Sequence, residues 1–210
     1  MQRLAHLVPA GTVAVDVGAN QGSHLTKQLR TLVGPTGRVI AIEPNPTLVP
    51  SILQCEPTAE VLSVAVTDQT GPVWLYLGQQ SPHASLWAAN VLNPTGERLL
   101  VRGVTLDELQ ATGELPAPIS VLKVDIQGGE AAMLRGAVGL LQTQRPCWYI
   151  ELWASGLRTA GDSLEAVRTL YEASDYQPLD LSWDTCCARA NGCSGHGAVD
   201  VCIVPRERSG

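Results

Sequence analysis

Val15-Asp-Val-Gly-Ala-Asn-Gln-Gly22 is the stretch that decides the fold of this 210-residue chain. The apolar residues that precede Gly18 predict a buried strand, because a short apolar run bounded by a turn is typical of strands. Gly18, Asn20 and Gly22 predict a turn that takes left-handed backbone angles and leaves room for a ligand. Apolar residues then recur at helical spacing until Gly34-Pro35 ends the helix. Strand, turn and helix in this order form the front half of a nucleotide-binding βαβ unit.

Two acidic residues indicate which kind of nucleotide this turn would bind. Asp16 lies two residues before Gly18, where its carboxylate would repel the pyrophosphate that dinucleotide-binding turns hold. A carboxylate there suits a ligand with cationic groups and no phosphate, such as S-adenosylmethionine. Glu43 lies about twenty residues past the glycines and ends the next apolar run, where an acid accepts hydrogen bonds from ribose hydroxyls. Together the two acids favour a binding site over an ordinary strand-to-helix turn.

Composition limits the classes of protein to consider. A length of 210 residues favours one domain over residues 1–210, and 45% hydrophobic residues are enough for a full core. The net charge of −6 argues against a nucleic-acid partner. The sequence has neither a run of about eighteen apolar residues nor a signal-peptide pattern, so we expect a cytoplasmic protein that does not span a membrane.

Apolar segments of strand and helix type alternate along the chain, which predicts a mostly parallel sheet with helices on both faces. The expected strands cover Thr12–Val17, Arg38–Glu43, Glu60–Val66, Val73–Leu77, Leu99–Val104, Ser120–Ile126 and Trp148–Leu152. The expected helices cover Ser23–Val33, Thr47–Cys55 and Glu130–Leu141, and a further helix follows a capping box formed by Asp162 and Glu165. Tyr176–Leu181 and Val199–Val204 predict a closing antiparallel pair.

Acidic residues lie at or just after the ends of five expected strands. They are Asp16, Glu43, Asp68, Asp125 and Glu151. Ligands of such sheets bind beyond the carboxyl ends of the strands. Solvated loops account for some of these acids, and the others favour a binding rim.

Residues 69–96 contain no Asp, Glu, Lys or Arg. One interpretation is an active-site cover that excludes water and contacts a neutral hydroxylated acceptor. The other is an ordinary loop followed by an edge hairpin. His83 and Trp87 are the candidate functional residues of this segment.

Cysteines gather near the end of the chain, at Cys186, Cys187, Cys193 and Cys202, with His196 among them. Such a set could bind zinc, but it lacks a Cys-x2-Cys pair. Free thiols are favoured in a cytosolic protein, and a disulfide is the alternative where the chain meets an oxidant. We therefore assign no metal-binding residue.

Six blocks in the same order resemble the FkbM-type methyltransferase family, over about residues 9–153. They are Val15-Asp-Val-Gly-Ala-Asn-Gln-Gly22, Ile42-Glu-Pro-Asn45, Ala65-Val-Thr-Asp-Gln-Thr-Gly71, Val104-Thr-Leu-Asp-Glu-Leu109, Leu122-Lys-Val-Asp-Ile-Gln-Gly-Gly-Glu130 and the segment from Pro146 to Leu152. The resemblance implies a three-layer α/β sandwich with a seven-stranded, mostly parallel, Rossmann-like methyltransferase sheet and an antiparallel closing strand. It also implies S-adenosylmethionine-dependent O-methylation of a hydroxyl on a sugar, a polysaccharide or a natural-product small molecule.

The resemblance also carries residue roles over to matching positions. The cofactor-binding set would be Asp16, Gly18, Asn20, Gly22, Glu43, Pro44, Asp68 and Asp125. In this set the residues up to Gly22 would line the methionine end, Glu43 the ribose and Asp68 the adenine. Lys123, Asp125 and Glu130 would lie near the acceptor.

The chain departs from the family pattern in two places. Gln127 replaces the glutamate of the usual Lys-x-Asp-x-Glu-Gly motif, so it keeps hydrogen bonding and loses charge. The chain also begins almost at its first strand, whereas many relatives carry an N-terminal segment that could cover the acceptor. We expect either a minimal protein or one that takes a cover from a second subunit, as in a homodimer.

Methyl transfer to an alcohol requires a general base, because the donor is activated and the hydroxyl is not. Asp125, at the end of the central strand, is the first choice, although it could instead bind a ligand or cap a loop. Lys123 shares its strand face and could stabilise a developing alkoxide. His83 and His24 are alternative bases. Glu151 could ligate the acceptor, or a divalent ion together with Asp125, so metal dependence stays open.

Two other functions remain open on the sequence alone. One is a nucleotide-dependent enzyme on a similar sheet, against which Asp16 argues. The other is a catalytically silent S-adenosylmethionine-binding module, for which Gln127 and the short N-terminus leave room. In the favoured interpretation the partner is a small-molecule or glycan acceptor, with no nucleic acid and no membrane.

Overall fold

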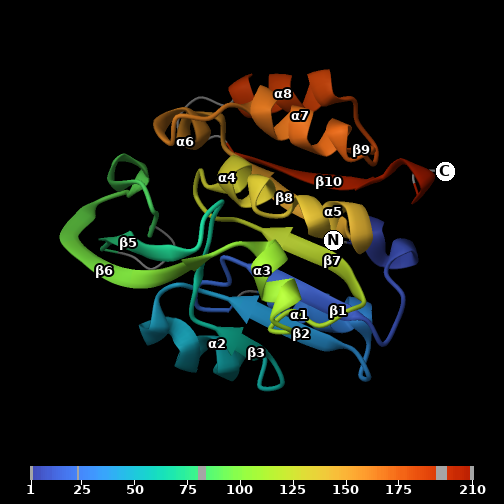
Figure 1. Ribbon diagram of the computed structural model, residues 1–210, viewed down its shortest axis with the longest axis horizontal. Helices are drawn as coiled ribbons and strands as arrows, with labels where there is room; N and C mark the ends of the chain where they lie inside the picture. The colour runs from blue at the N-terminus through green and yellow to red at the C-terminus, as the bar shows by residue number, and fades with distance from the viewer. Residues whose placement is uncertain (1, 23, 80–83, 193–197, 209–210) are drawn as a thin grey trace.

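A seven-stranded sheet forms the centre of the protein, which a computed structural model describes over residues 2–22, 24–79, 84–192 and 198–208. Its strands are β1 (Val13–Val17), β2 (Arg38–Ile42), β3 (Glu60–Leu62), β7 (Ile119–Val124), β8 (Cys147–Leu152), β9 (Tyr176–Pro178) and β10 (Val199–Pro205). They lie in the order β3-β2-β1-β7-β8-β10-β9, and β10 runs antiparallel to both its neighbours (Figure 1). The predicted mostly parallel sheet with an antiparallel closing pair is confirmed.

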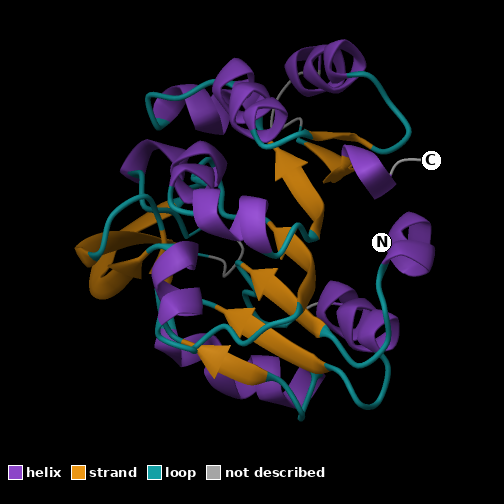
Figure 2. Ribbon diagram, turned by 45° about the vertical axis from the view of Figure 1, so that its right-hand side comes forward, coloured by secondary structure: helices purple, strands orange, loops and turns teal. Residues whose placement is uncertain are grey.

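Helices cover both faces of this sheet, which gives the three layers that the sequence predicts (Figure 2). Val15, Leu122 and Trp148 belong to the core of one face. The helices packed there are α3 (Leu106–Ala111), α4 (Glu130–Arg135), α5 (Val138–Thr143), α6 (Ala154–Thr159), α7 (Leu164–Ala173) and α8 (Trp183–Gly192). Among the described residues, no helix has both the length and the apolar character to cross a membrane.

The opposite face, called the α1 face below, packs against fewer elements. They are the 3-10 helix η1 (Gln2–Leu7) and helix α1 (His24–Val33), which contact Ala14, Val121 and Cys147. Because side chains alternate along a strand, residues of β1, β7 and β8 two positions further on, including Asp16 and Lys123, also belong to the α1 face.

A smaller sheet lies beyond the carboxyl ends of the parallel strands (Figure 1, Figure 2). It contains β4 (Ala65–Val66), β5 (Gly71–Gly78) and β6 (Pro94–Val104), in the order β4-β6-β5. The prediction of one strand over Glu60–Val66 is therefore wrong. Strand β2 ends at Ile42, opposite Leu62, so the chain has no further partner in the large sheet. It turns away and pairs with β6 from Ala65 onward.

The expected single helix over Glu130–Leu141 is divided into α4 and α5. Gly136 lies so close to another segment that a Cβ atom there would be 2.4 Å from the carbonyl oxygen of Thr67. Helix α5 begins anew beside α3, because the carboxylate of Asp107 accepts hydrogen bonds from the N–H groups of Gly139 and Leu140, both at 2.8 Å. A cap supplied by a distant element leaves no local sequence signal.

The predicted capping box at Asp162 is also wrong. Ser163 caps α7, since its hydroxyl accepts a hydrogen bond from the N–H of Ala166 at 3.1 Å. The carboxylate of Asp162 instead pairs with the guanidinium of Arg135 at 2.8 Å. Both residue types favour N-caps, and here the ion pair decides between them. The remaining helix, α2 (Val49–Cys55), follows a 3-10 turn over Pro46–Leu48.

The turn between β1 and α1 requires both of its glycines, each for a different contact. Gly18 has a φ of +76°, and a Cβ atom there would lie 1.9 Å from the carbonyl oxygen of Asp125. Gly22 has a φ of +74°, and its Cβ would lie 2.7 Å from the Cβ of Cys55. Gly18 therefore lets the turn approach the end of β7, whereas Gly22 lets it approach α2.

Replacing Gly18 by alanine should be far more harmful than the backbone angle alone explains. We expect Gly18→Ala to lower the free energy of unfolding by about 2–5 kcal/mol, of which about 1–2 kcal/mol is the left-handed angle and the rest overpacking. Gly113→Ala is the control, since Gly113 has a φ of +80° with no atom near its Cβ position. Urea unfolding measures both, and equal losses would contradict the close-approach explanation.

Candidate functional site

A small cavity lies at the carboxyl edge of the parallel strands, directly beside the Gly18 turn. Its volume is about 110 Å³. The lining residues are Gly18, Asn20, Glu43, Pro44, Leu75, Ala84, Ser85, Leu86, Asp125, Ile126 and Gln127. The structure thus brings together five of the predicted cofactor residues. Small-molecule sites usually measure about 300–1,000 Å³, so a cofactor there must displace residues 84–86 or extend beyond the cavity. We call this the turn cavity.

Glu43 lines the turn cavity, is buried, and holds two of the loops around it. Its two carboxylate oxygens accept hydrogen bonds from the N–H groups of Asn20, at 2.8 Å, and Asn45, at 2.9 Å. Burial raises the pKa of Glu43, and these two N–H donors partly offset that rise. A carboxylate has about four acceptor positions, so Glu43 can hold the turn and still accept hydrogen bonds from ligand hydroxyls.

Asp16 does not line the turn cavity, contrary to the sequence prediction. Its side chain is fully buried on the α1 face, where one oxygen lies 3.0 Å from the ammonium of Lys123 and the other accepts a hydrogen bond from Thr26 at 2.6 Å. Lys123 also donates to the carbonyl oxygen of Gly18 at 2.6 Å. The cause is register, because Asp16 and Lys123 are paired neighbours on β1 and β7.

Lys123 is therefore not a free cation near the acceptor, as predicted from the sequence, because its ammonium is paired with Asp16. Burial alone would lower the pKa of Lys123, but the charges of Asp16 and Asp125 outweigh it and leave that pKa raised. The ammonium stays protonated and is committed to Asp16 and the Gly18 carbonyl. Its role is to hold the turn against β7.

Two other predicted cofactor residues also lie away from the turn cavity. Asp68 pairs with Arg135 at 3.2 Å, which directs its carboxylate toward α4. Gly22 packs against Cys55. His83 lies outside the described residues, so its predicted role as a base stays a prediction. His24 begins α1 and lies outside the turn cavity, in a second cavity on the α1 face.

Comparison with known proteins identifies the family. The chain matches the methyltransferase FkbM domain over residues 16–178, which is well over half of its length. The chain belongs to the FkbM methyltransferase family. The hexuronic acid methyltransferase AglP of Haloferax volcanii is 28% identical over 132 residues, which cover 61% of this chain and 51% of that protein.

Solved structures show the same fold. The FkbM methyltransferase of Methylobacillus flagellatus has a TM-score of 0.55 at 18% identity, covering 93% of this chain and 43% of that one. Aeropyrum pernix fibrillarin with bound S-adenosyl-L-methionine has a TM-score of 0.51 at 11% identity, covering 94% of this chain and 68% of that one. The present chain spans about half the length of AglP and less than half the length of the FkbM methyltransferase of Methylobacillus flagellatus.

Gln127, the departure from the usual FkbM motif, connects two acids of the site. Its amide nitrogen donates to a carboxylate oxygen of Asp125 at 2.7 Å and to one of Glu151 at 3.2 Å. A glutamate could not donate to both in its ionised form, so the substitution adds a function as well as removing a charge. We call Asp125, Gln127 and Glu151 the acid bridge.

Glu151 is the member of the acid bridge whose acidity is most changed. Burial, followed by the charge and hydrogen bond of Asp125, raises the pKa of Glu151 to about 8. Such a group can exchange a proton near neutral pH, which the sequence prediction of Asp125 as the base did not anticipate. The sequence places Glu151 at a strand end, but its burial beside Asp125, which raises its pKa, leaves no local sequence signal.

Glu130, predicted near the acceptor, does not line the turn cavity. It begins α4 fully buried, with one oxygen accepting from the N–H of Gly128 at 3.2 Å. Burial raises the pKa of Glu130 to about 7. The contact supports the loop that carries the acid bridge.

The segment of residues 69–96, which has no charged side chain, forms one wall of the turn cavity through Leu75 and residues 84–86. Ser85 pairs with Tyr76, and its hydroxyl donates to the carbonyl oxygen of Gln127 at 3.1 Å. The amide of Asn90 donates to the same oxygen and to that of Gly156, both at 3.0 Å. Trp87 packs against Gly129. These contacts tie residues 84–90 to the acid-bridge loop, and a covering role for the segment stays a prediction.

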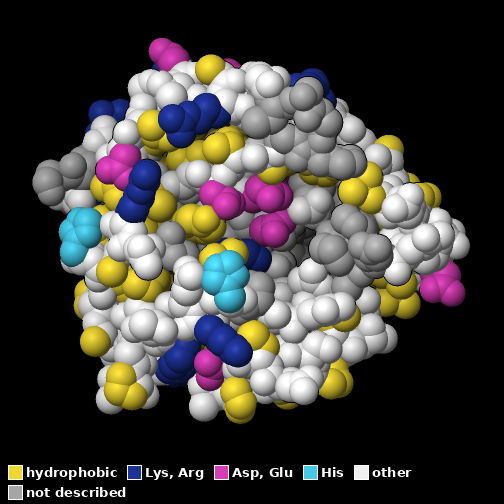
Figure 3. Space-filling view, turned by 180° about the vertical axis from the view of Figure 1, so that it is seen from behind, with side chains coloured by type: hydrophobic (Ala, Val, Ile, Leu, Met, Phe, Trp, Pro, Cys, Tyr) yellow, Lys and Arg dark blue, Asp and Glu magenta, His cyan; other side chains and the backbone are white. Residues whose placement is uncertain are grey.

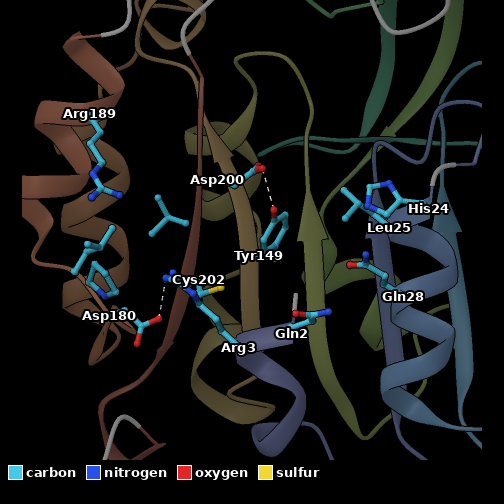
Figure 4. A pocket seen from close by; sticks show the side chains of 13 residues that line it. Gln2, Arg3, His24, Leu25, Gln28, Tyr149, Asp180, Arg189, Asp200 and Cys202 are labelled. Atoms are coloured by element: carbon cyan, nitrogen blue, oxygen red, sulfur yellow. Dashed lines mark hydrogen bonds and ion pairs between the residues drawn. The ribbon is translucent and has the colours of Figure 1, made fainter.

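A second and larger cavity lies on the α1 face, which Figure 4 shows surrounded by side chains of η1, α1, β8, β10 and α8. Its volume is about 530 Å³. Tyr149 lies in it and donates a hydrogen bond to the carboxylate of Asp200 at 2.9 Å. Burial and this hydrogen bond raise the pKa of Tyr149, so the phenol stays a donor. Sequence reasoning missed both residues. We call this the open-face cavity.

The late cysteines do not form a group in the described structure. Cys186 and Cys187 are free thiols on α8, and Cys202 is a free thiol on β10 beside the open-face cavity. Cys193 and His196 lie outside the described residues. In the described ranges, no cluster of three or more metal-ligating side chains is present.

Breaking the pair of Lys123 and Asp16 should strongly destabilise the fold. We expect Lys123→Met to lower the free energy of unfolding by about 3–5 kcal/mol, because it leaves a buried carboxylate without its counterion. In the double variant Lys123→Met/Asp16→Asn, the free energy of unfolding should fall by less than the sum of the losses in the two single variants. Arg38→Met is the control, since the Arg38–Glu60 pair is half exposed and worth less than about 1 kcal/mol. Additive losses in urea unfolding would show that the pair is not coupled.

The acid bridge predicts an unusual titration. Carbon-13 NMR of the Glu151 carboxyl should show a midpoint near pH 8, against an ordinary value of 4.5. In Asp125→Asn the midpoint should fall, because a neutral neighbour no longer opposes ionisation. A wild-type midpoint near 4.5, or one that Asp125→Asn does not move, would contradict the described bridge.

Proposed function

We propose that the protein is an S-adenosylmethionine-dependent O-methyltransferase that acts on a hydroxyl of a sugar. The observation that carries the proposal is the turn cavity beside the acid bridge. Its described lining includes the carboxylates of Glu43 and Asp125 and contains no lysine, arginine or histidine. Such a lining suits a cationic nucleoside without phosphate and disfavours a dinucleotide.

The residues present fit this cofactor. The turn approaches the end of β7 so closely that only glycine is accommodated at position 18, and Asn20, Glu43 and Pro44 line the adjoining wall. Glu43 would hold the ribose hydroxyls, because its oxygens keep acceptor capacity beyond their two backbone partners. Leu75 and Leu86 offer apolar surface against which the adenine ring of the cofactor would pack. Asp16 contributes indirectly, through Lys123 and the Gly18 carbonyl.

The acid bridge would perform the proton transfer. When bound, S-adenosylmethionine supplies a methyl group whose bond to sulfur breaks as a bond to the acceptor oxygen forms, with the electron pair remaining on sulfur. Glu151, in its ionised form, takes the hydroxyl proton, and Gln127 holds it beside Asp125. A base matched to the working pH is the most effective one. Activity should therefore rise with pH up to about 8, where Glu151 ionises.

A sugar acceptor is supported by the nature of the relative and by the second cavity. The curated relative is named a hexuronic acid methyltransferase. The open-face cavity is lined mostly by polar side chains, and polyhydroxylated ligands require such hydrogen-bonding partners. The net charge of −6 argues against a nucleic-acid acceptor.

Cofactor binding provides the first test. S-adenosylhomocysteine should raise the melting temperature of the wild type through selective binding to the folded state. Glu43→Gln should weaken that binding about tenfold or more, because a charged acceptor is lost. Asp68→Asn is the matched control, since Asp68 lies outside the turn cavity, and it should keep the full shift.

The reaction is tested with labelled S-adenosylmethionine and a panel of acidic and neutral glycosides. Label should be incorporated by the wild type and lost in Glu151→Gln, while the cofactor-induced shift of that variant persists. A wild type that responds to NAD and not to S-adenosylhomocysteine would overturn the proposal.

A further inference from the structure

The open-face cavity lies on the α1 face of the large sheet, between side chains of α1 and α8. Helix α1 packs over β1 and β2, and η1 packs with Cys147 and Val204 at one end of β8 and β10. Further along these two strands, Tyr149 and Cys202 are only partly buried. Tyr149 and Cys202, which are paired neighbours on these strands, form the floor of the cavity. At about 530 Å³, the cavity has the size of a small-molecule site.

One end of this cavity adjoins the acid bridge. Asp200, which lines the cavity, lies directly opposite Glu151 in the ladder between β10 and β8. The charge of Asp200 acts on Glu151, and Gln127 connects Glu151 to Asp125 in the turn cavity. The acid bridge is therefore the boundary between the two cavities. Asp and Glu side chains gather beside a hollow near the centre of the face opposite to that of Figure 1 (Figure 3).

The side walls of the open-face cavity carry two arginines, and within the described residues only one of them has a counterion. Arg3 pairs with Asp180 at 3.0 Å, whereas Arg189 forms no ion pair with any described carboxylate. Arg189 extends from α8, across the cavity from His24 and Gln28 of α1 (Figure 4). A guanidinium with free donors suits a carboxylate, which it binds through two parallel hydrogen bonds.

We propose that the open-face cavity is the acceptor site and that it takes a uronic acid, with Arg189 binding the sugar carboxylate. The sugar lies over Tyr149, and one of its hydroxyls reaches the acid bridge beside Asp200. Arg189 is then a specificity residue and has no part in proton transfer. This inference rests on the proposed function, because it assumes that the turn cavity holds the cofactor.

The test uses direct binding, so that it does not depend on turnover. Methyl β-D-glucuronide and methyl β-D-glucoside differ only in having a carboxylate or a hydroxymethyl group, and saturation-transfer NMR in the presence of S-adenosylhomocysteine compares them. The wild type should bind the glucuronide about tenfold more tightly than the glucoside, the ratio expected for one charge-assisted contact. Arg189→Gln should remove that preference. Arg158→Gln, on α6 and outside the cavity, should keep it.

A second variant tests the location independently of charge. Gln28→Trp fills the cavity from α1 and should abolish binding of both glycosides, whereas Lys27→Trp, one residue away and exposed, should not. In all variants the S-adenosylhomocysteine shift of the melting temperature should match the wild type. Unchanged glucuronide binding in Gln28→Trp, or no glucuronide binding by a wild type that binds S-adenosylhomocysteine, overturns this inference alone. Absence of the S-adenosylhomocysteine shift in the wild type overturns the proposed function instead.

Discussion

The buried ion pair between Lys123 and Asp16 is the constraint on which the site depends. It joins the two central strands, and the same ammonium holds the carbonyl of Gly18 at 2.6 Å. Two charges taken out of water are favourable only when their geometry and remaining hydrogen bonds are good. Thr26 supplies one of those bonds from α1. The pair therefore fixes the strand ends, the turn and the first helix relative to one another, and the turn cavity takes its shape from them.

The fold could be predicted from the sequence to a large extent, because its signals are local. The apolar run before Gly18, the turn residues and the helical spacing after them are all observed as β1, the turn and α1. The failures are non-local. Helix α5 begins at a cap supplied by Asp107, and the segment after Leu62 changes sheets because β2 has ended. The residues within those segments carry no sequence signal for the start of α5 or for the change of sheet.

The site was predicted less completely, for a related reason. Glu43 and Asp125 lie at the turn cavity as expected, since a strand end determines their place. Asp16 also lies near a strand end, but its side chain points to the α1 face and meets Lys123 through the register of β1 and β7. Sequence alone gives the alternation along one strand and not the register between two. Tyr149 and Asp200 were missed because only the pairing of β8 with β10 brings them together.

In the proposed function, the turn cavity holds the cofactor, the open-face cavity holds the acceptor, and the acid bridge between them takes the proton. Gln127 allows the carboxylates of Asp125 and Glu151 to share one donor. Burial and the nearby charge of Asp125 raise the pKa of Glu151, as a general base near neutral pH requires.

A crystal structure with S-adenosylhomocysteine tests the account most directly. It should show the ligand against Glu43 and the Gly18 turn, with residues 84–86 displaced, Lys123 still on Asp16, and the open-face cavity free. A ligand bound over Tyr149, or a broken Lys123–Asp16 pair in the complex, would contradict it.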